Sequence, residues 1–137
     1  KAATIELVSY LKQELEERVS DVVESGRLTD SPCVLVVPSG GMGLNMERIM
    51  KMTDQEFAPT KRILEINPRH PIIRNLAALR AKARDGGEEI GDKLKEWSNF
   101  LVDYVLLGEG TVDEPQRVTR TLQSIMTEAT DKVVNER

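Results

Sequence analysis

The sequence GEGTVDEP, residues 108–115, separates two long amphipathic patterns and decides how the last third of the chain folds. Gly108 and Gly110 are typical of a helix end. Thr111 is followed three residues later by Glu114, which is the spacing of a capping box at the start of a helix. The stretch therefore predicts one helix that ends here and a second helix that begins here.

Each flanking segment carries an apolar stripe at helical spacing. Residues 88–107 predict a helix with a stripe of Ile90, Leu94, Trp97, Leu101 and Tyr104, widened by Phe100, Val105 and Leu107. The final helix carries Val118, Leu122, Ile125, Ala129 and Val133 along one face. Two such helices form an antiparallel hairpin with more apolar surface than the pair can hide. The surplus must meet either the rest of the chain or a second copy, which would complete a four-helix bundle.

Residues 1–87 predict a small α+β body. Apolar residues at helical spacing indicate a helix over residues 4–17, and β-branched runs indicate strands at 19–28, 32–38 and 61–67. The prolines of NPRHP stop the third strand, and residues 72–83 predict another helix. The expected fold class is α+β and mostly helical, with a small three-stranded sheet and flanking helices before a long C-terminal hairpin. The length of 137 residues fits a single domain.

The composition, 39% hydrophobic and 31% charged, is typical of a soluble, helix-rich protein. No apolar run approaches the roughly 20 residues that span a bilayer. The net charge is −4, and no basic patch interleaved with aromatic residues occurs, so we expect no membrane or nucleic-acid partner. Lys1 already lies in a helical pattern, which suggests a piece of a longer protein. The single cysteine, Cys33, cannot form an internal disulfide and suits a reducing compartment.

Candidate catalytic groups are few. The single histidine, His70, lies in a turn with no nucleophile or orienting carboxylate near it in sequence, so we expect a structural role. The loop GGMG, residues 40–43, lacks both phosphate-binding spacings and is a weak candidate for nucleotide binding. Cys33 sits in an apolar run and should be an inert, buried thiol. We expect no catalytic site, metal or cofactor in this chain.

Methionine is concentrated in SGGMGLNMERIMKM, residues 39–52, which holds four of the five methionines. Read as an amphipathic helix over 42–52, this segment places Met42, Met46, Ile49 and Met50 on one face. The simpler interpretation is that this face points into the core. Flexible thioethers, however, specify a unique core poorly and suit surfaces that hold varied apolar partners. Both interpretations stay open at this point.

Four motifs occur here in one order: RLTDSPCVLV, NMERIMK, LEINPRHPII and LLGEGTVDEP. With them the chain resembles the carboxy-terminal domain of the ninety-kilodalton heat-shock chaperone family, whose bacterial member is called high-temperature protein G. The resemblance covers residues 5–126. It implies one C-terminal dimerisation domain over 1–137, with a body at 1–87 and a hairpin at 88–137 that forms an intermolecular four-helix bundle. The implied homodimer interface comprises Leu94, Trp97, Leu101, Tyr104, Val105, Val118, Leu122, Ile125 and Met126.

The resemblance also implies a role in an ATP-dependent chaperone that assists protein folding. Met42, Met46, Ile49 and Met50 would contact unfolded or partly folded client proteins. ATP and magnesium would bind other domains of the parent protein, so this chain would not itself be an enzyme. The ending KVVNER lacks the acidic pentapeptide that binds tetratricopeptide cochaperones, which favours a bacterial cytoplasmic or an organellar protein. The alternatives are a purely structural dimer module with a buried methionine stripe and a small nucleotide-binding domain that uses residues 40–43.

Overall fold

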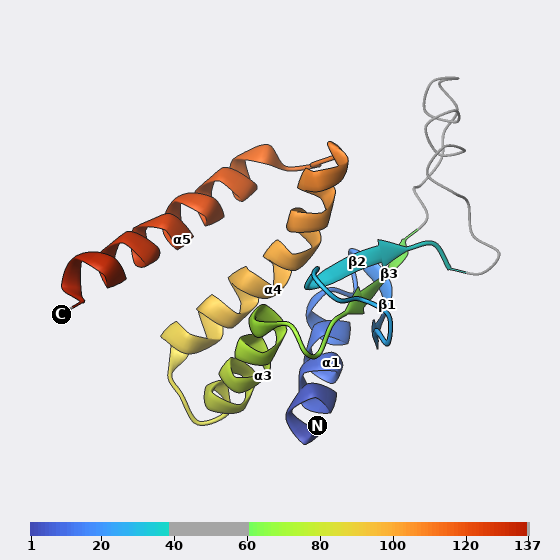
Figure 1. The fold of residues 1–137 in the computed structure, drawn as a ribbon, viewed down its shortest axis with the longest axis horizontal. Coiled ribbons are helices and arrows are strands. Elements are labelled where there is room, and N and C mark those ends of the chain that lie inside the picture. The colour runs from blue at the N-terminus through green and yellow to red at the C-terminus, as the bar shows by residue number, and fades with distance from the viewer. Residues whose placement is uncertain (39–60, 137) are drawn as a thin grey trace.

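The computed structural model describes residues 1–38 and 61–136, and Figure 1 shows their course. The elements are α1 (Ala2–Glu14), β1 (Val19–Glu24), β2 (Cys33–Val36), β3 (Arg62–Ile66), α3 (Pro71–Ala83), α4 (Glu88–Glu109) and α5 (Pro115–Asn135). The prediction of a mostly helical chain with a small three-stranded sheet is confirmed. The predicted helix at 42–52 with its methionine face, and the glycine loop at 40–43, lie outside the described residues.

The sheet has the order β1-β3-β2, so the last strand in sequence lies in the middle. β1 pairs with β3 in parallel, and β2 pairs with β3 antiparallel. Leu64 and Ile66 of the central strand are fully buried. The β-branched runs predicted that the three strands exist. They did not predict the order of the strands, because that order depends on which strand is paired on both edges and covered on its faces.

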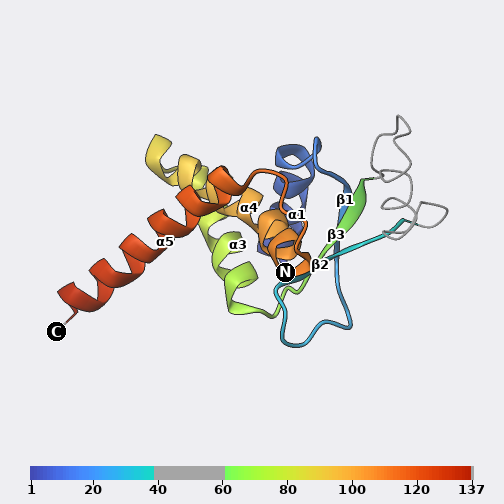
Figure 2. The same cartoon turned by 90° about the horizontal axis from the view of Figure 1, so that it is seen from above.

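One hydrophobic core joins α1, the sheet, α3 and α4. Leu7, Leu11 and Leu15 follow at intervals of four residues, so they lie on one face of α1 and its C-terminal turn, and all three are fully buried. From α4 the same core receives Leu94, Leu101 and Val102. Figures 1 and 2 show α4 beside α3 and α1, in agreement with these contacts. Part of the apolar stripe of α4 therefore meets the body of its own chain.

The loop between α4 and α5 confirms one sequence expectation and corrects another. Gly110 has φ 73°, and its N–H donates to the carbonyl of Leu107 while the N–H of Thr111 donates to that of Leu106, which is a Schellman motif. The predicted capping box at Thr111 and Glu114 is wrong. Thr111 completes the end of α4, and α5 begins at Pro115, whose ring suits the first helical position.

The helix α5 stands apart from the core. It buries Val118 and Thr121 near its start. Beyond them, Figures 1 and 2 show α5 running away from the body, so that the C-terminal end lies far from the sheet. Leu122, Met126 and Val133, three residues of its apolar stripe or beside it, are exposed. The surplus apolar surface predicted for the hairpin thus lies on α5 and, at Tyr104 and Leu107, on the C-terminal half of α4.

Candidate functional site

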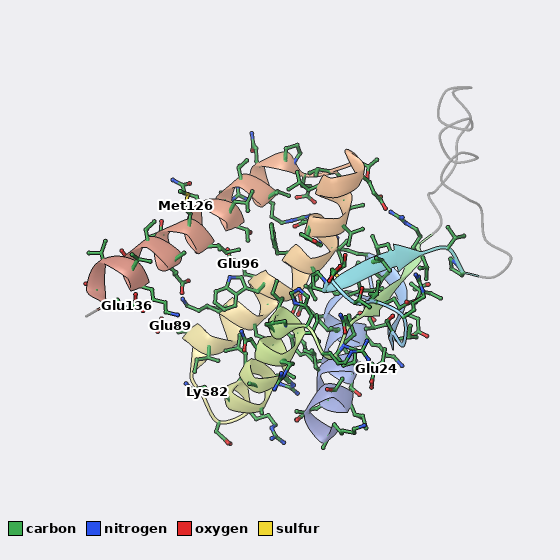
Figure 3. All side chains as sticks on the ribbon, in the orientation of Figure 1. Glu24, Lys82, Glu89, Glu96, Met126 and Glu136 are labelled. Atoms are coloured by element: carbon green, nitrogen blue, oxygen red, sulfur yellow. The ribbon has the colours of Figure 1, made fainter. Side chains whose placement is uncertain are left out.

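The hairpin of α4 and α5 has one polar side. Between the two helices lies an open cleft of about 420 Å³. Its lining residues are charged or polar: Glu14, Asp92, Lys95, Glu96, Asn99, Asp103, Arg117, Arg120 and Thr121. Figure 3 shows Glu96 in the space between the helices. Basic and acidic groups are mixed along this cleft, so it offers no concentration of one charge to a ligand.

The other side of the hairpin is apolar. With about 3.6 residues per turn, the side chains on this flank are Trp97, Phe100 and Tyr104 of α4 and Leu122, Ile125 and Met126 of α5. We call these six residues the apolar side. Leu122 is 40% exposed and Met126 is 68% exposed. Figure 3 labels Met126 on the stretch of α5 that leaves the body. Exposed apolar side chains that gather on one side of a hairpin are typical of an interaction site.

The structure divides the nine predicted interface residues into two groups. Leu94, Leu101 and Val118 are buried inside this chain. The other six are exposed or partly buried: Trp97, Tyr104, Val105, Leu122, Ile125 and Met126. Helical periodicity identifies an apolar stripe but does not say which neighbour covers it. The interface as a whole stays a prediction.

A buried carboxylate, Asp103, holds the start of α5 against α4 and α1. Its side chain is 1% exposed. Arg18, just after α1, donates to it at 2.6 Å, and Arg117 of α5 donates to it at 2.8 Å and 3.2 Å. The hydrogen bond to Asp103 is the main reason why the pKa of Arg117 is raised. Sequence reasoning missed this cluster, although an acid inside the apolar run FLVDYVLL was a usable signal.

Two further ion pairs involve the hairpin: one joins α4 to the sheet, and the other joins α4 to α5. Arg62 at the start of β3 forms a two-pronged pair with Glu109 at the end of α4, with both distances 2.9 Å. Lys93 of α4 meets Glu128 of α5 at 2.6 Å, and this hydrogen bond is the main cause of the raised pKa of Lys93. The second pair is exposed to solvent and therefore contributes little. The Asp103 cluster remains the principal polar connection between α5 and the body.

An apolar groove of about 310 Å³ lies at the C-terminal end of α4 and shares Tyr104 with the apolar side. Cys33, Tyr104, Val105, Leu107 and Gly108 line it. Cys33 is buried, its thiol donates to the carbonyl of Leu101 at 3.7 Å, and burial raises its pKa to about 12. The expectation that Cys33 is buried is confirmed, and its raised pKa disfavours the thiolate, which is the reactive form.

The expected structural role of His70 is also confirmed. It caps the N-terminus of α3, where its Nδ1 accepts a hydrogen bond from the N–H of Ile72 at 3.1 Å. In residues 1–38 and 61–136, no three His, Cys, Asp or Glu side chains are grouped so that they could hold a metal ion. Within the same ranges, none of the helices is long and apolar enough to cross a membrane.

The family model for "Hsp90 protein" matches residues 1–137 of the chain. The chain belongs to the Hsp90 family. Among similar proteins of this family is "Chaperone protein HtpG" of Geobacter sulfurreducens, 40% identical over 122 residues, or 88% of this chain and 18% of the relative. The HtpG of Myxococcus xanthus is 38% identical over 125 residues, or 89% of this chain and 18% of the relative. The family resemblance based on four motifs is confirmed, and this Hsp90-family chain spans less than a fifth of these relatives' length.

Proposed function

We propose that this chain is the dimerisation and client-contacting domain of an ATP-dependent chaperone that assists protein folding. Membership of the Hsp90 family and similarity to proteins named chaperones support this proposal. One observation carries it: Tyr104 of α4 and Leu122 and Met126 of α5, all on the apolar side of the hairpin, stay exposed, whereas Leu94, Leu101 and Val102 of α4 are covered by the core. Burying apolar surface stabilises a complex by about 25 cal/mol for each Å² removed from water, so association of a second copy with this side would be favourable.

In the proposed homodimer, α4 and α5 of each copy form an intermolecular four-helix bundle. A two-fold axis presents the same surface of both copies to each other, which a self-complementary apolar side allows. Dimerisation would hold the attached parts of two parent chains at high effective concentration, often in the millimolar range for short connections. ATP and magnesium would act in those parts. The chain itself is proposed to have no catalytic site and no cofactor.

Client contact is assigned to Met42, Met46, Ile49 and Met50, which lie outside the described residues. The sequence supports this assignment, since adaptable thioethers share one face of the predicted helix. Replacing Met46 and Met50 by serine in the parent protein should weaken the suppression of client aggregation and leave the melting temperature nearly unchanged. A loss of several kcal/mol of stability would instead indicate a buried stripe and a purely structural module.

A bacterial cytoplasmic location is part of the same proposal, because the similar HtpG proteins come from bacteria. The nucleotide-binding alternative makes a different prediction. Titration calorimetry with ATP should show no binding to this chain, with or without magnesium. Tight magnesium-dependent binding would favour a nucleotide site at residues 40–43.

Equilibrium sedimentation at micromolar concentration tests the dimer. The wild-type chain should sediment as a dimer, and a Leu122→Glu/Met126→Glu variant as a monomer, because each charge would have to be desolvated at the interface. Ile72→Glu is the control, since Ile72 is 47% exposed on α3 and is not one of the six residues of the apolar side. Leu101 is unsuitable for this test because it is buried in the core. A monomeric wild-type chain would overturn the proposal.

A further inference from the structure

The carboxylate of Asp103 is shared by two arginine side chains that come from distant parts of the chain. Arg18, just after α1, donates to Oδ1 of Asp103 at 2.6 Å. Arg117 of α5 donates to the same oxygen at 2.8 Å and to Oδ2 at 3.2 Å. Two guanidinium groups that meet at one oxygen are close neighbours, and both are positively charged. The charge of Asp103 therefore offsets their mutual repulsion.

The other acids beside these arginines are exposed to solvent. Asp113 lies 3.7 Å from both arginines, and Glu114 pairs with Arg117 at 2.9 Å. Water screens both of these acids, so each attracts an arginine more weakly than a buried carboxylate does. Asp103 is buried. It is therefore the main counter-charge of both guanidinium groups.

The cluster lies where a small movement has a large effect on α5. The buried residues of this helix, Val118 and Thr121, are near its start, and Figure 1 shows the rest of α5 leaving the body. Asp131 lies about 24 Å along the helix from Pro115, so a tilt of about 10° displaces Asp131 by about 4 Å. A change at the start of α5 is thus amplified toward its far end.

We propose that Asp103 is an electrostatic joint that sets the direction of α5. While the carboxylate is ionised, it holds the two arginines together, and the start of α5 stays beside Arg18. Without that charge the arginines repel each other, α5 moves away from Arg18, and the hairpin opens. Leu122 and Met126 lie on the moving helix, so opening redirects them. The inference concerns a single chain and does not depend on the proposed dimer.

Distances between two spin labels within one chain test the joint. In a Cys33→Ala background, Ala78→Cys on α3 and Asp131→Cys on α5 place the labels at exposed positions. A large excess of unlabelled chains ensures that every measured distance lies within one copy. Asp103→Asn keeps the size of the side chain and removes its charge, so it should lengthen the mean distance and broaden its distribution. Asp113→Asn is the matched control and should leave both unchanged.

A second substitution distinguishes repulsion from a simple loss of hydrogen bonds. Asp103→Asn/Arg18→Gln removes the carboxylate charge together with one of the two repelling charges. The distance distribution should therefore return toward that of the wild type. If hydrogen bonds alone mattered, the double variant would be at least as broad as Asp103→Asn, and this result would overturn the proposal. An Asp103→Asn distribution equal to that of Asp113→Asn would also overturn it.

Circular dichroism shows whether each variant keeps its native helix content. If Asp103→Asn does not fold, the two arginines test the same joint. Arg18→Gln leaves a balanced pair of charges at α5 and should keep the wild-type distance, whereas Arg117→Gln releases α5 and should lengthen it. Equal distances in these two variants would contradict the joint. A wild-type chain that is monomeric would defeat the dimer and leave these intrachain distances unchanged.

Discussion

At the scale of single residues, burial changes the acid–base chemistry of Cys33. The side chain lies on β2 under the end of α4, where its thiol donates to the carbonyl of Leu101. Burial disfavours the thiolate and raises the pKa of Cys33 to about 12. An unfolded chain would ionise this group near pH 8.5. Between these two values the folded state binds one more proton than the unfolded state.

This difference predicts a loss of stability in alkaline solution. Because the unfolded state loses its proton first, the free energy of unfolding should fall as pH rises above about 8.5, by up to about 1.4 kcal/mol per pH unit. Urea unfolding of wild type and Cys33→Ala from pH 7 to 10 would measure it. Other titrating groups are shared, so the stability gap between the two proteins should narrow steadily above pH 8.5. A constant gap would contradict the raised pKa.

At the scale of elements, α5 depends on a small number of contacts. Its start is buried through Val118 and Thr121, and Arg117 and Arg18 meet at Asp103. The more distant Lys93–Glu128 pair is exposed and adds little. The orientation of α5 relative to the body therefore rests largely on one buried carboxylate. That orientation also decides which way the apolar side of the hairpin faces.

Replacing Asp103 should destabilise the chain far more than replacing its exposed neighbour. Asp103→Ala leaves two arginines without their buried partner and should cost about 2–3 kcal/mol, somewhat below the usual cost for a fully buried pair because both arginines retain some exposure. Asp113 lies 3.7 Å from the same arginines but is 61% exposed, so Asp113→Ala should cost less than about 0.5 kcal/mol. Urea unfolding of both variants and of the wild type would measure the two losses of stability. Equal costs would mean that Asp103 does not anchor α5.

At the scale of the whole molecule, the chain combines a buried hydrophobic core with a helix, α5, that extends away from that core. The core shared by α1, the sheet, α3 and α4 accounts for the stability of the body, whereas α5 extends from it with Leu122, Met126 and Val133 exposed. An arrangement of this kind gains stability when a second copy covers the stripe. Folding and association should then be linked.

The linkage predicts a melting temperature that depends on concentration. Ligands that bind only the folded state stabilise it by mass action, and a second copy acts as such a ligand. A hundredfold increase in concentration should raise the melting temperature of the wild type by roughly 5 °C. Leu122→Glu/Met126→Glu should melt at the same temperature throughout this range. Calorimetry at several concentrations would test both statements, and a concentration-independent wild type would speak against association.

The sequence by itself determined the kinds of elements and the family. Apolar spacing, prolines and glycines are local signals, so α3, α4, α5 and the three strands could be predicted within a few residues, and four motifs indicated the Hsp90 family. Only the tertiary structure decided the order of the strands and which neighbour each apolar face meets. Leu101 and Leu122 belong to similar periodic stripes, yet one is buried in the core and the other is 40% exposed. Periodicity records that a face is apolar, and only the packing of distant elements settles what covers it. The sequence did not reveal the pairing of Asp103 with Arg18 for the same reason, because the two residues are 85 positions apart and only the packing brings them together.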